Sequence, residues 1–186
     1  MTPLHHGTRP LQTPRLCLRP FKEQDAEDIF SSFAADPAVT RYLNWTPHET
    51  LEETRKVLGY WMDEYGSDMV YNWAIEYEGH VVGNLAAVEM SSQNSFVQVA
   101  YCLSRRLWNQ GLMTEALNAV IHYFLDECLF HRVYARCIVE NAASGRVMEK
   151  SGMRKEGVLR QQKRLEDGSF HDIAVYGILK GEKQKE

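Results

Sequence analysis

Several segments of the chain alternate polar with apolar residues, or form short apolar runs, as strands do. Glu78-Gly79 and Asp167-Gly168 each separate two such segments and are typical of tight hairpin turns. The segments with strand patterns are Arg15–Phe21, Met69–Tyr77, His80–Met90, Ser95–Leu103, Arg132–Glu140 and Gly157–Leu179, the last of which contains two strands.

Apolar residues at steps of three and four predict helices between the strands. The clearest helix follows Gly111, and its apolar face consists of Met113, Ala116, Leu117, Val120, Ile121 and Phe124. Other helices are expected over Asp25–Ala35, about Thr50–Tyr65, and Asn141–Gly152. Asp36-Pro37 ends the first of these, and residues 39–50 are predicted to form a loop with aromatic anchors.

This order of elements predicts an α+β fold in which a central sheet carries helices on both faces. The chain has 186 residues, so we expect a single domain over residues 1–186. Residues 1–12, which include His5-His6, are expected to form a flexible tail.

The composition is that of an ordinary globular protein, with 44% hydrophobic and 25% charged residues. No apolar run has the length of a membrane span, and the first residues lack the apolar core of a signal peptide, so we expect a cytoplasmic protein without membrane contacts. The net charge of −4 argues against a nucleic-acid partner and favours a cationic one, such as an amine.

The cysteines predict neither disulfides nor a metal site. Cys17, Cys102, Cys128 and Cys137 are scattered, with no C-x-x-C pair and no histidine at metal-ligand spacing. Reduced, mostly buried thiols are therefore expected, and no metal. Fingerprints of dinucleotide-binding and P-loop folds are also absent from the sequence.

A lone glycine, Gly111, stands where a strand pattern ends and a helix pattern begins. Glycine lets a ligand approach the backbone closely, and the first turn of a helix presents unpaired N–H groups. Both features suit an anion, most often a phosphate, although an ordinary turn would also place glycine here.

Two spaced motifs, "YCLSRRLWNQGLMTEAL" and "RVYARCIVENAASGRVMEKSGMRKEGVLR", together with the opening "TPRLCLRPFKEQDAEDIF", resemble the GCN5-related N-acetyltransferase (GNAT) superfamily. Within it, the chain is similar to the ribosomal-protein-alanine N-acetyltransferase (RimJ/RimL-like) branch. The resemblance covers residues 13–179. It implies a GNAT fold with a mixed, mostly antiparallel sheet of about seven strands, and an enzyme whose co-substrate is acetyl-CoA.

The resemblance also implies roles for individual residues. Backbone N–H groups of the loop from Asn109 to Thr114 hold the pyrophosphate of acetyl-CoA. A backbone N–H of the strand before this loop, in the stretch from Tyr101 to Leu103, stabilises the oxyanion. Asn141 contacts the pantetheine arm, Ser144 protonates the leaving thiolate and Arg146 reaches an adenosine phosphate, although helix capping and solvent exposure would also explain these three. The implied cofactor-binding residues are Tyr101, Cys102, Leu103, Asn109, Gln110, Gly111, Leu112, Met113, Thr114, Asn141, Ser144 and Arg146.

The sequence departs from the family pattern in two places. Trp108 and Met113 stand where Gln or Arg and a small residue are usual in the loop. A backbone-made nest tolerates such changes wherever the side chain points away.

The general base is the second departure. In the strand pattern "QVAY", Gln98 stands where the branch often carries Glu. Lys163 in the last hairpin is no base in its charged form. Glu89 is the remaining carboxylate candidate, with a solvated strand-end residue and a water-carried proton as alternatives. Tyr42, Trp45 and Trp73 are expected to line the acceptor cleft, or to serve as core anchors.

A site without an obvious strong base favours an α-amine as acceptor. An α-amino group with a pKa of about 7.7 to 8.0 is partly neutral at pH 7, whereas a lysine amine with a pKa of about 10.4 costs over about 4 kcal/mol to deprotonate. The N-terminal α-amine of a protein, such as a ribosomal one, is therefore the predicted substrate. A small-molecule amine (amino acid, antibiotic or polyamine) and a non-catalytic acyl-CoA-binding module remain open, as does a monomeric or homodimeric state.

Overall fold

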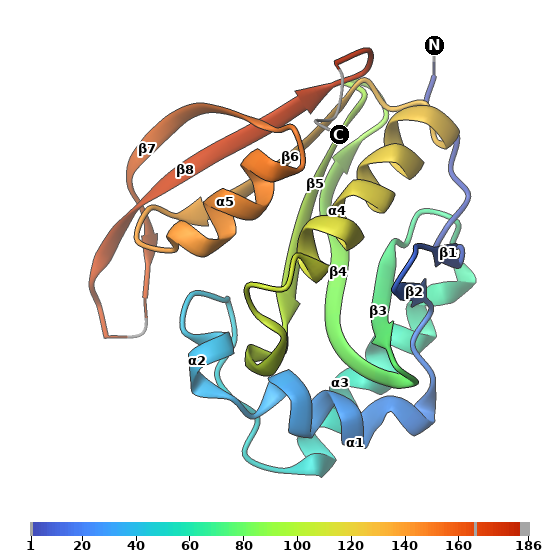
Figure 1. Cartoon of the computed structure of the whole chain (residues 1–186), viewed down its shortest axis with the longest axis vertical. Helices are drawn as coiled ribbons and strands as arrows, with labels where there is room; N and C mark the ends of the chain where they lie inside the picture. The colour runs from blue at the N-terminus through green and yellow to red at the C-terminus, as the bar shows by residue number, and fades with distance from the viewer. Residues whose placement is uncertain (1, 166, 183–186) are drawn as a thin grey trace.

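The computed structural model describes residues 2–165 and 167–182 (Figure 1). Eight strands form one sheet in the order β1-β2-β3-β4-β5-β6-β8-β7. The strands are β1 (Leu11–Gln12), β2 (Leu16–Arg19), β3 (Asn72–Tyr77), β4 (His80–Ser91), β5 (Phe96–Leu103), β6 (Arg132–Ile138), β7 (Arg154–Arg164) and β8 (Phe170–Leu179). Only β5 and β6 pair in parallel, so the sheet is mixed and mostly antiparallel, as expected. It has eight strands rather than about seven because the two-residue β1 pairs with β2.

In the described part of the chain, five α-helices connect and cover the strands: α1 (Ala26–Ile29), α2 (Pro37–Thr40), α3 (Leu51–Asp63), α4 (Leu112–His122) and α5 (Ala142–Lys150). π-helical turns continue α1 through Ala34 and α4 through Glu127. The loop predicted over residues 39–50 begins instead with the end of α2. Asp36 caps this helix by accepting a hydrogen bond from the Ala38 N–H, and Pro37 occupies its first position.

Helices pack on both faces of the sheet, as the sequence predicted. Trp73 and Ile75 of β3 are fully buried in the cluster that contains Leu117 of α4. Ala74 between them belongs to a second cluster, with Ile29 of α1 and Leu58 of α3. Because neighbouring strand residues point to opposite faces, α4 and the α1–α3 group cover opposite sides. This confirms the α+β class.

The N-terminal segment, which the sequence predicts to be a flexible tail, makes several defined contacts. The Leu4 N–H donates to the Cys128 carbonyl at 2.8 Å, and the His5 imidazole lies 2.8 Å from the Ser92 hydroxyl. Trp73 anchors the following stretch, because its indole N–H donates to the Arg9 carbonyl at 2.7 Å. These contacts join the segment to the end of the α4 extension, to the turn after β4 and to β3. The polar residues of the segment did not indicate them.

Strands β5 and β6 separate along their length, and this separation creates the site. Their parallel register runs from Phe96 opposite Arg132 to Val99 opposite Ala135 and ends there. Beyond it, β5 stays paired with β4 as far as Leu103, while β6 stays paired with β8 as far as Ile138. The two halves of the sheet therefore diverge after Val99, and a gap opens between β5 and β6 (Figure 1).

Candidate active site

A cleft of about 750 Å³ occupies the gap between β5 and β6. Segments far apart in the sequence form it: the loop after α2, strands β4, β5, β6, β7 and β8, and the start of α5. Its lining residues are Tyr42, Leu43, Asn44, Trp45, Asn84, Ala86, Val88, Glu89, Gln98, Val99, Ala100, Tyr101, Cys102, Arg136, Cys137, Ile138, Asn141, Ser144, Gln162, Lys163 and Ile173. Most of the side-chain candidates of the sequence analysis are thus brought together.

The cleft reaches both faces of the sheet. Val97, Val99 and Tyr101 pack with the α4 cluster, whereas Cys102 packs with the α1–α3 cluster. Gln98 and Cys102 are an even number of residues apart, so they share that second face. We call the side with Tyr101 and Ser144 the helix α5 side, and the side with Glu89 and Gln98 the acceptor side.

The Gly111 turn has the geometry of an anion nest. Gly111 is the N-cap of α4 with φ +77°, and Asn109 has φ +61°, so two left-handed residues turn the exposed backbone just before the helix. The first turn of α4 leaves the N–H groups of residues 112–114 without intrahelical acceptors. Leu112 and Met113 are buried in the core, so their side chains leave the nest open. The residues present fit a pyrophosphate.

Arg15 and Glu115 hold this turn against β2, a feature that the sequence analysis missed. The Arg15 guanidinium donates to Glu115 Oε2 at 2.7 Å and to the Gln110 carbonyl at 3.0 Å. Thr13 Oγ1 donates to Glu115 Oε1 at 2.6 Å. Burial acts to raise the pKa of Glu115, but these hydrogen bonds hold it below its usual range. The arginine belongs to the opening motif "TPRLCLRPF", whose contact with the distant turn only the fold reveals.

On the helix α5 side, the hydroxyls of Tyr101 and Ser144 lie 3.0 Å apart, and the Tyr101 hydroxyl also donates to the Ser144 carbonyl at 3.1 Å. Burial raises the pKa of Tyr101, so the phenol keeps its proton at neutral pH. Asn141 caps α5, because its side-chain oxygen accepts from the Ser144 N–H at 3.2 Å. The capping alternative for Asn141 is therefore correct, and it leaves Asn141 at the cleft.

The β5 backbone offers donors only at alternate residues. The Ser104 N–H donates to the Val82 carbonyl of the β4 side at 2.7 Å, and the antiparallel ladder repeats this orientation every second residue. The Cys102 backbone N–H therefore also points toward β4. This corrects the inclusion of Cys102 among the oxyanion donors. The N–H groups of Tyr101 and Leu103 face the gap. The Leu103 carbonyl already accepts from the Trp108 indole N–H at 2.8 Å.

On the acceptor side, three side chains form a row across the sheet. Glu89 lies opposite Gln98 in the β4–β5 pair, and Gln98 lies opposite Tyr134 in the β5–β6 pair. The Tyr134 hydroxyl donates to Glu89 Oε2 at 2.8 Å. Burial, and then Glu89, raise the pKa of Tyr134 to about 12. The predicted base Glu89 is thus a hydrogen-bonded carboxylate at the cleft, and Tyr134 is a partner that the sequence analysis did not identify.

Tyr42 and Trp45 line the cleft, whereas Trp73 is a core anchor, the alternative given for all three. Trp73 is fully buried, because its position on β3 directs the ring into the α4 cluster. Lys163 of β7 lines the cleft and hydrogen-bonds the Asn44 side-chain oxygen, so the last hairpin meets the loop after α2. Arg146 is exposed on α5, outside the residues that line the cleft.

The thiols near the cleft are protonated at neutral pH. Burial raises the pKa of Cys102 to about 12 and raises that of Cys137 as well. Neither therefore offers a thiolate nucleophile for a covalent acyl intermediate. Among residues 2–165 and 167–182, no group of histidine, cysteine and acidic residues is arranged to hold a metal ion. No helix in the same part of the chain is both long and apolar enough to span a membrane.

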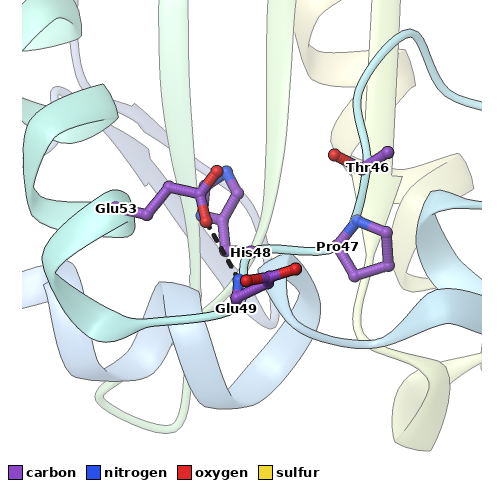
Figure 2. A pocket seen from close by; sticks show the side chains of 5 residues that line it. All are labelled: Thr46, Pro47, His48, Glu49 and Glu53. Carbon is purple, nitrogen blue, oxygen red and sulfur yellow. Dashed lines mark hydrogen bonds between the residues drawn. The ribbon is translucent and has the colours of Figure 1, made fainter.

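A second hollow lies at the start of α3 (Figure 2). Thr46, Pro47, His48, Glu49 and Glu53 line it. Glu53 accepts a hydrogen bond from the Glu49 N–H at 2.9 Å, and the His48 imidazole lies 2.8 Å from the Thr54 hydroxyl. These contacts fix the entry of the chain into α3, so we assign this hollow a structural role.

Comparisons with known proteins show which proteins this chain is similar to. The family model "Acetyltransferase (GNAT) domain" matches residues 15–154. The chain is 30% identical over 172 residues to "Uncharacterized N-acetyltransferase YoaA" of Bacillus subtilis, covering 91% of this chain and 96% of the relative. It is 26% identical over 144 residues to the ribosomal-protein-serine acetyltransferase of Escherichia coli, covering 74% and 76%. The crystal structure of a GNAT-family acetyltransferase from Bacillus anthracis superposes with a TM-score of 0.80 at 26% identity, covering 92% and 99%.

Proposed function

The chain belongs to the GNAT family of acetyltransferases, and we propose that it transfers the acetyl group of acetyl-CoA to the N-terminal α-amine of a protein, such as a ribosomal one. The E. coli relative named for a ribosomal-protein serine supports an acceptor of this class. One observation carries the proposal: a single cleft joins the Ser144–Tyr101 hydroxyl pair on one side of the sheet to the Glu89 carboxylate on the other.

Acetyl-CoA binds in this proposal with its pyrophosphate on the Gly111 turn, where the backbone from Asn109 to Thr114 supplies N–H donors and the helix start favours negative charge. Its pantetheine arm follows the edge of β5 that is unpaired beyond Val99, past Asn141 toward Ser144. Arg146, exposed on α5, is the proposed partner of an adenosine phosphate. The thioester carbonyl accepts from the N–H of Tyr101 or Leu103, which also stabilises the oxyanion as it forms.

The reaction is a direct attack of a neutral amine on the thioester. The nitrogen lone pair forms a bond to the carbonyl carbon and the C–S bond breaks. Ser144, held 3.0 Å from the Tyr101 hydroxyl, gives a proton to the departing thiolate and regains one from water in the cleft, while Tyr101 keeps its own proton and orients the serine. Glu89, or water beside it, takes the proton that the amine loses. The protonated Cys102 and Cys137 favour this direct route over a thiol-bound acyl intermediate.

The protonation of the acceptor supports an α-amine over a lysine. Glu89 is an exposed carboxylate that accepts a hydrogen bond from Tyr134. Carboxylates as a class are much weaker bases than amines. An amine that is already partly neutral at pH 7 needs no strong base to remove a proton before it attacks. From the neutral fractions alone, an α-amine is favoured over a lysine amine by roughly two to three orders of magnitude at pH 7. The cytoplasmic location expected from the sequence stays a prediction.

Thiol release from acetyl-CoA tests the proposal with three acceptors: a short Ala-starting peptide, the same peptide with a blocked N-terminus and an exposed lysine, and spermidine. We expect turnover of the free N-terminus at neutral pH, with kcat/KM rising along the titration of its amine. Faster turnover of the blocked peptide would indicate a lysine acceptor. Faster turnover of spermidine would indicate a small-molecule acceptor, the alternative that an open cleft also suits.

A further inference from the structure

Three unbalanced charges border the acceptor side of the cleft. Glu89 on β4 carries the negative charge, and Arg136 on β6 and Lys163 on β7 carry the positive ones. Tyr134, a neutral group, hydrogen-bonds Glu89, and Asn44, also neutral, hydrogen-bonds Lys163. Arg136 is exposed, and within residues 2–165 and 167–182 it forms no ion pair or hydrogen bond. The Glu89 carboxylate and the cationic groups of Arg136 and Lys163 thus line the same cleft, and none of the ion pairs among the described residues joins them.

The positive charges belong to one half of the split sheet. Strand β7 has the sequence RKEGVLRQQKR, with five basic residues and one acidic residue in a chain whose net charge is −4. Arg136 and Tyr134 are two residues apart on β6 and therefore point to the same face. Arg136 is close enough to Tyr134 to counter part of the rise in its pKa, although burial and Glu89 dominate that rise. Arg136 thus approaches the cleft beside the Tyr134–Glu89 pair.

A buried amide lies between the two charged halves. The Gln98 side chain is 7% exposed, borders the cleft and lies opposite Glu89. Its oxygen has no hydrogen-bond partner among the described residues. Leaving a buried carbonyl oxygen without a hydrogen-bond donor is unfavourable. A ligand N–H would satisfy it, and the neighbouring carboxylate would suit the same nitrogen.

We propose that the acceptor carries an acidic group next to its amine, so that Gln98 and Glu89 receive the amine while Arg136 and Lys163 pair with the anion. Within the proposed function, on which this inference rests, the substrate is a protein N-terminus with Asp or Glu among its first residues. The net charge of the whole chain predicted a cationic partner. The proposed acceptor keeps the amine of that expectation and adds an acidic group, because the local charge of the cleft, rather than the total, acts on the bound acceptor.

Peptides that differ only in charge test this inference. We compare kcat/KM for Ala-Glu-Glu, Ala-Gln-Gln and Ala-Lys-Lys N-termini on one common C-terminal sequence. The acidic peptide is expected to exceed the neutral one by about tenfold, the combined effect of two partly exposed charge pairs, and the excess is expected to shrink with added salt. Arg136→Gln and Lys163→Gln each reduce the ratio, and Arg136→Glu shifts the preference toward the basic peptide.

Arg160→Gln is the matched control, because Arg160 is an exposed cation of the same strand β7 that does not line the cleft. Its acidic-to-neutral ratio is expected to equal that of the wild type. Equal rates for the acidic and neutral peptides in the wild type would overturn the inference. So would a ratio that Arg136→Gln and Arg160→Gln lower to the same extent.

A pair of small acceptors separates this inference from the proposed function. The α-amides of glutamate and glutamine carry the same α-amine and differ by one carboxylate. If the peptides are inactive but the glutamate amide is preferred, the protein N-terminus is the wrong substrate and the charge recognition stands. If peptides are acetylated without regard to charge, the proposed function stands and the charge recognition falls.

Discussion

The coenzyme side of the proposed site and the acceptor side of the cleft are built by different means. The coenzyme side is the Gly111 turn, which lies outside the residues that line the cleft. It consists of left-handed Asn109 and Gly111, followed by the first turn of α4, so its proposed donors are backbone N–H groups. The acceptor side consists of side chains from β4, β5, β6 and β7 and the loop after α2. Backbone donors survive side-chain changes, and Met113, where a small residue is usual, points into the core. Side-chain recognition has no such protection, and acceptor specificity can change with one residue.

The first prediction concerns the chemistry between the two sides. In Ser144→Ala, kcat is expected to fall about 100-fold, while KM for acetyl-CoA stays within about twofold, because the proton is needed only in the transition state. The Asn141 cap survives, since it binds the Ser144 backbone N–H. Steady-state kinetics check this, with Ser144→Thr as the control that keeps a hydroxyl. A wild-type kcat in Ser144→Ala would leave Ser144 as a helix residue only.

The second prediction tests the backbone character of the coenzyme side. Gly111 has φ +77°, where a β-branched residue is strained, so Gly111→Val is expected to weaken acetyl-CoA binding at least about tenfold by calorimetry. Gly79→Val is the matched control, because Gly79 has φ +82° in the β3–β4 turn, away from the cleft. It should show comparable strain in a melting curve and unchanged affinity. Unchanged affinity in Gly111→Val would place the phosphates elsewhere.

The third prediction concerns the contacts that hold the turn. Arg15→Gln removes a hydrogen bond to the Gln110 carbonyl and an ion pair with Glu115. KM for acetyl-CoA is expected to rise about fivefold with little change in kcat, because a partly exposed pair contributes up to about 1 kcal/mol. S-acetylpantetheine, which lacks the pyrophosphate, is the control substrate and should show the same KM in both proteins. An equal rise with both substrates would mean that Arg15 does not act through the phosphate turn.

The smallest effect concerns pH. The folded protein holds the pKa of Glu115 below its usual value, so this carboxylate stabilises the fold above about pH 4.3, and its contribution disappears as the pH falls through the lowered pKa. Urea unfolding should show wild type more stable than Glu115→Gln at pH 7 by up to about 1 kcal/mol, with the difference shrinking in acid. A difference that grows on acidification would contradict the assigned sign.

The sequence predicted the regular elements well because their signals are local. Gly111 marks the start of α4 through its backbone freedom, and Asn141 marks the start of α5 through its capping oxygen. The same local reasoning left Trp73 between cleft lining and core anchoring, because an aromatic residue on a strand does not reveal which face it occupies, and the structure places it in the core. The contacts of Tyr134 with Glu89 and of Arg15 with Gln110 join residues 45 and 95 positions apart. Only the sheet order and the divergence of β5 from β6 bring such residues together.

The most direct test of the central claim, that one cleft receives coenzyme and α-amine from its two sides, is the affinity of a conjugate. In this conjugate the α-amine of an Ala-Glu-Glu peptide is joined through an acetyl linker to the sulfur of CoA. We predict by calorimetry that it binds at least about 100-fold more tightly than CoA alone, since linking converts the second binding event into an intramolecular one. Gly111→Val and Arg136→Gln should each weaken it. A conjugate that binds no more tightly than CoA would contradict the claim.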